Sequence, residues 1–160
     1  MPQPKKTQEH NSMEQADAIA MLKADHQRVR DLFARYQSAD SLQAKRTIAA
    51  EAFVELEVHA QVEEHVFYPA VNEETEEGPE LVKEALAEHE TVKQLIQALR
   101  AMEPSDTEFD ARFQELIQNV EHHVQEEEAA MLPMAEAELA EDLEDLKDEM
   151  QEIKQQLLTA

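Results

Sequence analysis

Four segments of this chain carry apolar residues at alternating steps of three and four, the spacing that gathers side chains on one face of an α-helix. Each of these stripes also contains one histidine. The stripes are Ile19, Leu22, His26, Val29, Phe33 and Tyr36; Ala52, Leu56, His59, Glu63, Val66 and Ala70; Val82, Ala85, His89, Val92, Ile96 and Leu99; and Phe109, Phe113, Leu116, Val120, His123, Glu127 and Ala130. One buried face per helix predicts an all-α, antiparallel up-down four-helix bundle.

Capping patterns predict where these helices begin. Three pairs match the capping box, in which two side chains satisfy free N–H groups of the first turn. They are Ser12 with Gln15, Asp40 with Gln43, and, after Pro104, Ser105 with Glu108. Gly78-Pro79 predicts the start of the third helix, because proline fits a first-turn position.

A fifth apolar stripe follows Pro133. It consists of Leu139, Leu143, Leu146, Met150, Ile153 and Leu157. Its phase does not continue that of the fourth helix, so we expect a break or kink near Pro133. The chain is therefore divided into a flexible tail (1–13), a four-helix bundle (14–134) and a C-terminal amphipathic helix (135–160). We expect this last helix to pack on the bundle, or to bind a partner helix or a second copy through residues 139–157.

The composition supports an all-helical protein. The 160 residues include one glycine and six prolines, and strong helix formers dominate. The formal net charge of −23 argues against nucleic acid and against anionic membrane surfaces, because both require clustered Lys and Arg. Without cysteine, the chain forms neither a disulfide nor a thiolate metal site. No apolar run follows residues 1–13, so we expect no signal peptide or membrane span, which favours a cytoplasmic location.

One motif occurs twice along the chain. A histidine is followed by glutamate four residues later and by proline ten residues later, first as His59, Glu63 and Pro69, then as His123, Glu127 and Pro133. Asp25-His26 and Glu88-His89 precede these second histidines by 33 and 34 residues. The repeat predicts two similar helical hairpins related by a pseudo-twofold axis.

Six polar residues lie on the apolar stripes, where burial is expected: His26, His59, Glu63, His89, His123 and Glu127. A buried carboxylate without a partner costs several kcal/mol, and no Lys or Arg holds a stripe position in this layer. A bound cation is the simplest compensation. Residues four apart on a helix have Cβ atoms about 5–6 Å from each other, so each His/Glu pair reaches one site. Imidazole and carboxylate ligands suit iron, manganese or zinc.

Two cations fit four imidazoles and two carboxylates best. His26 with His59 would serve one metal and His89 with His123 the other. Glu63 and Glu127 could bridge two metals roughly 3.5–4 Å apart.

This arrangement, His followed by His-x-x-x-Glu and repeated once, resembles the hemerythrin family in its HHE cation-binding form. The resemblance covers roughly Ile19 to Met134. It implies an up-down bundle with two Fe ions joined by an oxo or hydroxo bridge, for which Mn or Zn could substitute. Members of this family carry or sense dioxygen, respond to iron or nitric oxide, or turn over peroxide.

One departure from the family pattern bears on function. Oxygen-carrying hemerythrins have a second histidine four residues after the third-helix histidine, whereas this chain has Lys93. The missing imidazole favours sensing or redox chemistry over reversible oxygen carriage. Ferritin-like bundles use Glu-x-x-His instead, and no histidine here has glutamate three residues before it.

Several neighbouring residues are assigned lesser roles. His122 competes with His123 for the fourth-helix position, and we favour His123 because it matches His59 in the repeat. Glu64 and Glu128 either support the ligands or form a solvated face. Tyr68 matches Leu132 in the repeat, which favours packing.

The leading functional prediction is a di-iron protein that binds or senses a small oxidant such as O₂, NO or peroxide, or iron itself. An enzyme alternative is a di-iron peroxidase or oxidase, for which the sequence shows neither an organic-substrate pocket nor a dedicated general base. The other alternative is a metal-free helical interaction module.

Overall fold

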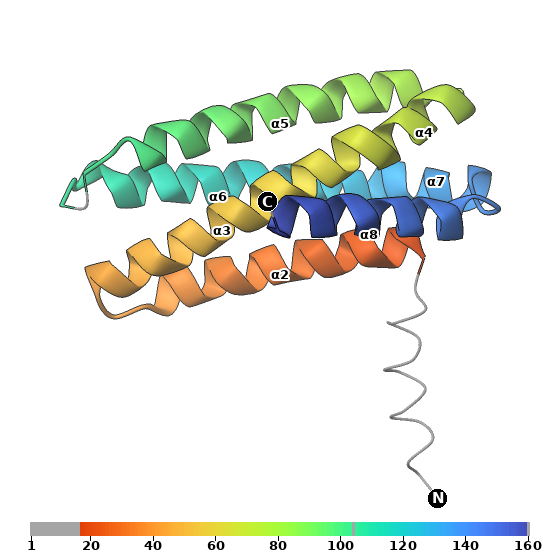
Figure 1. Cartoon of the computed structure of the whole chain (residues 1–160). Helices are drawn as coiled ribbons and strands as arrows, with labels where there is room; N and C mark the ends of the chain where they lie inside the picture. The colour runs from red at the N-terminus through yellow and green to blue at the C-terminus, as the bar shows by residue number, and fades with distance from the viewer. Residues whose placement is uncertain (1–16, 104, 160) are drawn as a thin grey trace, which may run out of the picture.

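The structure, a computed structural model, describes residues 17–103 and 105–159. Its helices in chain order are α2 (Ala18–Ser38), α3 (Leu42–Val62), the π-helical turn η1 (Glu63–Phe67), α4 (Tyr68–Glu74), α5 (Gly78–Arg100), α6 (Glu108–Glu126), the π-helical turn η2 (Glu127–Met131), α7 (Leu132–Glu138) and α8 (Leu143–Thr159). Two long rods, α3–η1–α4 and α6–η2–α7, lie beside α2 and α5 (Figure 1). The predicted all-α, up-down four-helix bundle is confirmed.

The helix α2 begins at Ala18. Asp17 has an extended backbone, and its carboxylate accepts a hydrogen bond from the Ala20 N–H at 3.2 Å. Asp17 is thus the N-cap of α2. The predicted cap, Ser12, lies outside the described residues.

Two predicted caps are wrong. Ser41, not Asp40, caps α3 and accepts a hydrogen bond from a first-turn N–H at 3.0 Å. The N-cap of α6 is Thr107, not Ser105, and the Glu108 N–H donates to the Asp106 carboxylate at 2.8 Å. Adjacent Asp and Ser side chains are equally able to cap, so helix packing decides between them.

The predicted start of the third helix at Gly78 is confirmed. α4 ends at Glu74, and the chain turns tightly into α5. A Cβ at position 78 would collide with the Val71 carbonyl and the Thr75 hydroxyl. Glycine is therefore required there by the close approach of the backbone.

A π-helical turn comes just before each proline of the repeat. The N–H groups of Tyr68 and Leu132 donate to the carbonyls of Glu63 and Glu127, five residues earlier. Proline has no N–H, and its ring clashes with the carbonyl four residues back, so the wider turn accommodates it without breaking the helix.

The extra residue in each π turn changes which side chains face the core. Ala130, predicted to be buried, is exposed, whereas Met131 and Leu132 are buried. Similarly, Ala70 is only partly buried and Val71 fully so. A wide turn rotates the helix that follows it. The predicted stripes used a regular 3.6-residue repeat and so place the residues after each π turn on the wrong face.

Of the break or kink predicted near Pro133, a break does not occur. The π turn η2 lies just before Pro133, the helix continues past it to Glu138, and the chain reverses at 139–142. α8 then packs against α2, α3 and η1 through Leu143, Leu146 and Met150 (Figure 1). No helix in the described ranges is long and apolar enough to cross a membrane.

Buried apolar side chains form two clusters. The α8-side core includes Leu22, Val62, Phe67, Leu132 and Met150, and the loop-side core includes Val29, Phe33, Leu56, Ile96 and Phe113. Each cluster contains residues from all four rods of the bundle, which are α2, α3–η1–α4, α5 and α6–η2–α7. The buried histidines and glutamates belong to neither cluster and form a polar layer of their own.

Candidate metal centre

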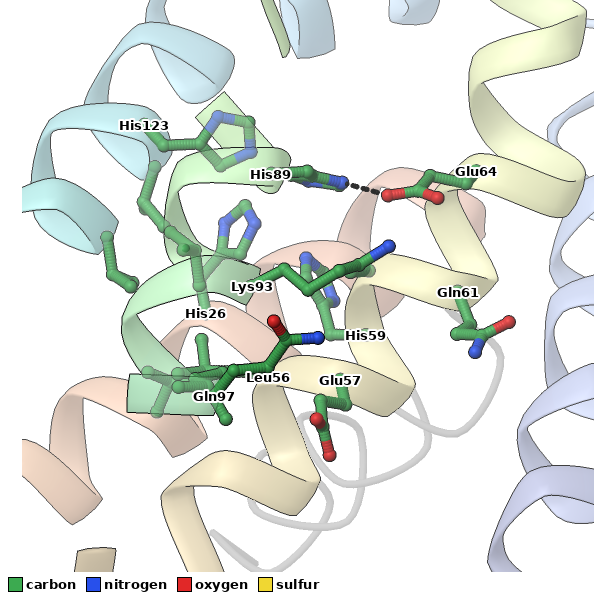
Figure 2. Close-up of a pocket in the computed structure, with 16 residues that line it drawn as sticks. His26, Leu56, Glu57, His59, Gln61, Glu64, His89, Lys93, Gln97 and His123 are labelled. Atoms are coloured by element: carbon green, nitrogen blue, oxygen red, sulfur yellow. Dashed lines mark hydrogen bonds and ion pairs between the residues drawn. The ribbon is translucent and has the colours of Figure 1, made fainter. Parts of the chain in front are cut away.

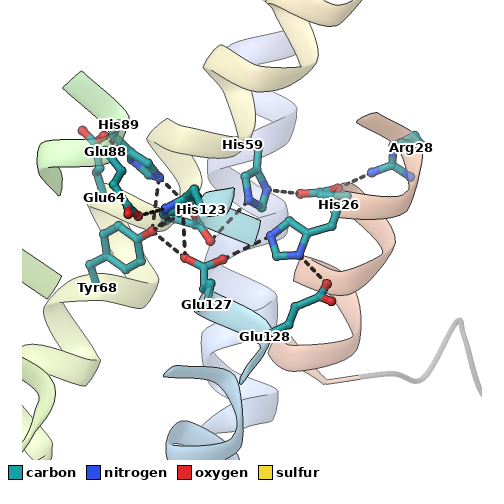
Figure 3. Close-up of polar contacts among 12 residues, drawn as sticks. His26, Arg28, His59, Glu64, Tyr68, Glu88, His89, His123, Glu127 and Glu128 are labelled. Carbon is teal, nitrogen blue, oxygen red and sulfur yellow. Dashed lines mark hydrogen bonds and ion pairs between the residues drawn. The ribbon is translucent and has the colours of Figure 1, made fainter. Parts of the chain in front are cut away.

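All six residues singled out in the sequence converge in the polar layer. His26 comes from α2, His59 from α3, Glu63 from η1, His89 from α5, His123 from α6 and Glu127 from η2, and all six are buried (Figure 3). Every rod of the bundle therefore contributes to one site.

Each glutamate spans both halves of this site. The two oxygens of Glu63 lie 3.2 Å from His59 Nε2 and 3.1 Å from His89 Nε2. Those of Glu127 lie 3.1 Å from His26 Nε2 and 3.5 Å from His123 Nε2. One oxygen toward each half is the arrangement that a bridging carboxylate needs.

A second set of carboxylates holds the outer edge of each imidazole. The Nδ1 atoms pair with Asp25 at 2.9 Å (His59), Glu64 at 2.7 Å (His89), Glu88 at 2.6 Å (His123) and Glu128 at 2.7 Å (His26). Each contact joins neighbouring rods, so the four close a ring around the bundle. An Nδ1–H given to a carboxylate fixes the ring orientation and directs Nε2 inward, as in histidines that bind metals.

The sequence pattern gave a signal for this outer ring. Glu64 and Glu128, whose role was left open, contact imidazoles. Asp25 and Glu88 were missed as supports, although each stands directly beside a site histidine. In every case an acidic residue adjacent in sequence to one ligand position supports the histidine of a neighbouring rod.

Tyr68 belongs to the site, so the expectation that it serves only in packing is wrong. Its hydroxyl has one proton and lies 2.6 Å from Glu127 and 3.0 Å from Glu63, either of which can accept it. The same oxygen lies 3.1 Å from His89 Nε2 and 3.4 Å from His123 Nε2. The π turn η1 places Tyr68 there, which regular helical spacing does not predict.

Four buried atoms of the site lack a hydrogen-bond partner among the described residues. They are His26 Nε2, His59 Nε2, Glu63 Oε2 and Glu127 Oε1. Buried polar atoms are normally satisfied, so this set calls for an explanation. Ligand atoms of these four residues lie within 4.8 Å of one another, and so do those of Glu63, His89 and His123. Imidazole nitrogens and carboxylate oxygens gathered in this way fit a metal cation.

The pKa shifts show how the residues balance charge without a cation. Burial opposes ionisation of Glu63, yet the charge and hydrogen bond of His59 hold its pKa well below the usual range. Burial likewise disfavours protonated His123, but Glu127 raises its pKa to about 9. Burial and the two glutamate charges raise the pKa of Tyr68 well above its usual value. Imidazole protons thus occupy the electrostatic role that a metal would take.

Two other histidines, His122 and His65, lie outside the polar layer. The His122 side chain is 66% exposed and faces Glu126 at 3.5 Å, whereas His123 is buried. His65 is exposed, and its Nδ1 contacts the Gln61 carbonyl. The preference for His123 over His122 agrees with this geometry.

A cavity of about 460 Å³ adjoins the four histidines (Figure 2). Its apolar walls are Val29, Leu56, Val92, Ile96, Val120 and Val124. Exposed residues of α3 and α5, Gln61, Lys93 and Gln97, line its outer end. Nothing in the sequence indicated this cavity, because helix periodicity cannot reveal a space left between helices.

Comparisons with known proteins agree with this site. Residues 17–135 match the family model described as the hemerythrin HHE cation binding domain. A crystal structure of a hemerythrin HHE cation binding domain-containing protein from Mycobacterium kansasii superposes with a TM-score of 0.75 at 25% identity, covering 89% of this chain and 87% of that one.

Two curated relatives are longer than the part that this chain matches. The chain is 31% identical over 111 residues to a protein named DNA nickase from Nostoc sp., covering 69% of this chain and 31% of the relative. It is 27% identical over 119 residues to an uncharacterized hemerythrin-like protein from Schizosaccharomyces pombe, covering 74% of this chain and 59% of the relative. The chain thus spans less than two thirds of either relative. From the family match, which extends over most of its length, the chain belongs to the hemerythrin HHE cation-binding domain family.

Proposed function

We propose that this protein holds a non-haem di-iron centre of hemerythrin type and uses it to bind or sense a small oxidant, O₂, NO or peroxide. The observation that carries the proposal is the pair of buried glutamates, each of which has one oxygen near an imidazole of the first half and the other near an imidazole of the second. Four unpartnered ligand atoms support it. Mn or Zn could substitute for iron with these ligands.

His26 and His59 would hold the first metal position, and His89 and His123 the second, with Glu63 and Glu127 shared. When bound, reduced iron supplies an open coordination position and electrons for the oxidant. The chain's own residues orient the imidazoles through the outer carboxylates. Tyr68 would keep a proton at its hydroxyl close to both shared glutamates, since its pKa is raised well above the usual value by burial and by their charges.

Lys93 supports sensing or redox chemistry over oxygen carriage. It stands where oxygen carriers have an additional histidine, and it lies at the mouth of the cavity beside the imidazoles. A small molecule entering there would meet the site on the side where that fifth imidazole is missing.

The stoichiometry of iron binding tests the proposal. After anaerobic loading, we expect two iron ions per chain and, after exposure to air, an oxo-to-iron charge-transfer band. At most one tightly bound metal would rule out the dinuclear centre, and no metal would leave the interaction-module alternative.

The cavity favours a second function, a di-iron peroxidase or oxidase acting on an organic molecule. A diatomic needs a space of the order of one water, about 30 Å³, whereas sites for organic ligands are commonly about 300–1,000 Å³. The observed 460 Å³ falls in the second class. Steady-state turnover of an organic hydroperoxide, lowered by Ile96→Phe in the cavity wall and not by Leu86→Phe on the exposed face of α5, would support this enzyme over a sensor.

The predictions of a cytoplasmic location and of no nucleic-acid partner rest on sequence and charge alone. The name DNA nickase describes a relative of which this chain matches 31%. A net charge of −23 disfavours phosphate binding, so we expect no retention of DNA in a mobility-shift titration at physiological salt.

A further inference from the structure

The C-terminal helix contacts the site through one buried carboxylate. Lys154 of α8 donates to Asp25 Oδ1 at 2.7 Å, and Asp25 Oδ2 pairs with His59 Nδ1 at 2.9 Å. Arg28 also donates to Oδ1. One Asp25 oxygen therefore contacts the two cations and the other contacts the imidazole. This arrangement fixes the orientation of the carboxylate relative to His59.

Asp25 differs from the other three outer carboxylates in its surroundings. Its side chain is 1% exposed, whereas those of Glu64, Glu88 and Glu128 are 30%, 25% and 26% exposed. Water can help to solvate and orient the latter three. Asp25 depends on protein partners instead, because a buried charge without a partner is strongly unfavourable.

Lys154 lies outside the part of the chain that the family model matches, residues 17–135. α8 also packs on α2 and α3, the two helices that carry Asp25, His26 and His59. The helix thus adds a contact to one half of the site that the duplicated motif does not contain.

We propose that Lys154 is a positioning residue for the first metal position, acting through Asp25 on His59. This inference rests on the proposed function, since it concerns the strength with which His59 holds a metal. With Lys154 in place, Asp25 keeps Oδ2 on His59 Nδ1, and His59 Nε2 stays directed toward Glu63. Without it, Arg28 is the cation that remains on Oδ1, water enters at the place that Lys154 leaves, and the carboxylate and the imidazole lose their fixed orientation.

The coupling is reciprocal by thermodynamic linkage. If docking of α8 strengthens metal binding at the first position, then metal bound there stabilises the docked helix by the same factor. α8 is therefore expected to report on metal occupancy without touching either metal position.

The test compares Lys154→Met with Lys147→Met, which removes the same charge from the same helix away from Asp25. Anaerobic Fe²⁺ titration should show about tenfold weaker binding of one of the two metals in Lys154→Met, the low end of the range for partners of ligating histidines. Lys147→Met should bind both metals as the parent does, and Lys154→Arg should restore most of the loss.

Two readouts distinguish positioning from general destabilisation. In metal-free protein with ¹⁵N-labelled histidine, Lys154→Met should shift the His59 Nδ1 resonance and leave that of His123 unchanged. In the parent, iron should increase protection of α8 from hydrogen exchange, and Lys154→Met should abolish this increase. If Lys154→Met loses helical circular dichroism, Lys154→Gln replaces it in every measurement.

The outcomes separate the two proposals. A parent protein that binds no iron would overturn the proposed function itself. A parent that binds two irons, with unchanged affinity and His59 resonance in the Lys154 variants, would overturn only the role of Lys154. Equal shifts at His59 and His123 would mean a general loss of packing and would also overturn it.

Discussion

The two halves of the candidate metal centre carry the same His/Glu motif in different surroundings. In the first half, His26 and His59 have inward nitrogens without hydrogen-bond partners among the described residues. In the second, the corresponding atoms of His89 and His123 lie 3.1 and 3.4 Å from the hydroxyl of Tyr68. The matching position in the other copy of the repeat is Leu132, which has no polar atom to offer.

This difference makes the two metal positions unequal. In the first, the inward nitrogens of His26 and His59 lie 3.1 and 3.2 Å from Glu127 and Glu63 but do not contact Tyr68, and the outer carboxylate of His59 is held by α8. The second must give up contacts with Tyr68 before a metal enters, at a cost of about 1 kcal/mol for each neutral hydrogen bond. We therefore expect the first position to fill before the second. A duplicated motif thus specifies a symmetrical ligand set but not symmetrical affinities.

The largest effect is expected from removing a glutamate that both halves of the site share. Glu63→Ala should weaken both metals by more than about 100-fold, above the range for outer partners, because each oxygen of Glu63 faces a different half. Metal analysis after anaerobic loading and desalting measures this, with Glu64→Ala as the neighbouring control. Loss of one metal only would show that Glu63 is a terminal ligand.

A substitution in one half of the site should affect the metal in that half alone. His123→Ala should empty the second position and leave the first metal bound, since the inward nitrogen of His123 lies among second-half ligands. His122→Ala is the matched control, and its exposed side chain predicts nearly unchanged iron content. Iron lost from His122→Ala and retained in His123→Ala would shift the α6 register and make Glu126 the ligand.

The dependence on pH should differ between metal-free and loaded protein. In metal-free protein, Glu127 raises the pKa of His123 to about 9 against burial, so the folded state binds an extra proton between about pH 6.5 and 9. Stability from this proton is complete below pH 6.5 and declines as pH rises, by about 1.4 kcal/mol per pH unit.

Metal binding reverses this trend because the cation displaces the proton. Urea unfolding at pH 6, 7.5 and 9 should show metal-free protein losing stability while apparent iron affinity rises. Parallel curves for metal-free and loaded protein would contradict an exchange of proton for metal at His123.

A smaller effect is expected from Tyr68→Phe, which removes the hydroxyl that distinguishes the halves. Metal-free protein should lose about 1–3 kcal/mol of stability, because Glu63 and Glu127 lose a buried donor. The second metal should bind up to about tenfold more tightly, narrowing the gap between the two positions. Stepwise titration measures the gap; a weaker second metal in Tyr68→Phe would identify the hydroxyl as a ligand instead.

Local periodicity was sufficient to predict which residues form the buried polar layer. The stripe neighbours of His26, His59, His89 and His123 are buried, apart from Val92, which is partly buried, and regular helices preserve that spacing. The glutamates follow four residues after two of these histidines and share their face. This part of the site required no knowledge of how the helices pack.

The remaining features depend on choices that periodicity does not encode. Tyr68 enters the site because η1 adds one residue before Pro69. A helix can accommodate a proline, which has no N–H to donate, by either a kink or a π turn. The contact between Lys154 and Asp25 joins residues 129 positions apart, a pairing that no local pattern specifies. The cap at Ser41 differs from the predicted Asp40 by a single, chemically similar neighbour.

The smallest expected effect concerns Lys93 and its counterpart Arg30, which follow His89 and His26 by one turn. Lys93 lines the cavity and extends from α5 at its mouth (Figure 2), and with His89 it lowers the pKa of Glu64. Arg30 pairs with Glu121 on α6 at 3.1 Å, lies 3.8 Å from Glu128, and does not line the cavity. Lys93→His should therefore place a fifth imidazole beside the second metal position and slow autoxidation of the reduced protein several-fold, by the order of about 1 kcal/mol in the barrier. Arg30→His is the equivalent change in the first half and should leave the rate unchanged, because position 30 lies outside the cavity. The iron spectrum of the reduced protein, followed after exposure to air, measures both. Equal rates in Lys93→His and the parent would mean that position 93 does not reach the metals, and the argument against oxygen carriage would lose its basis.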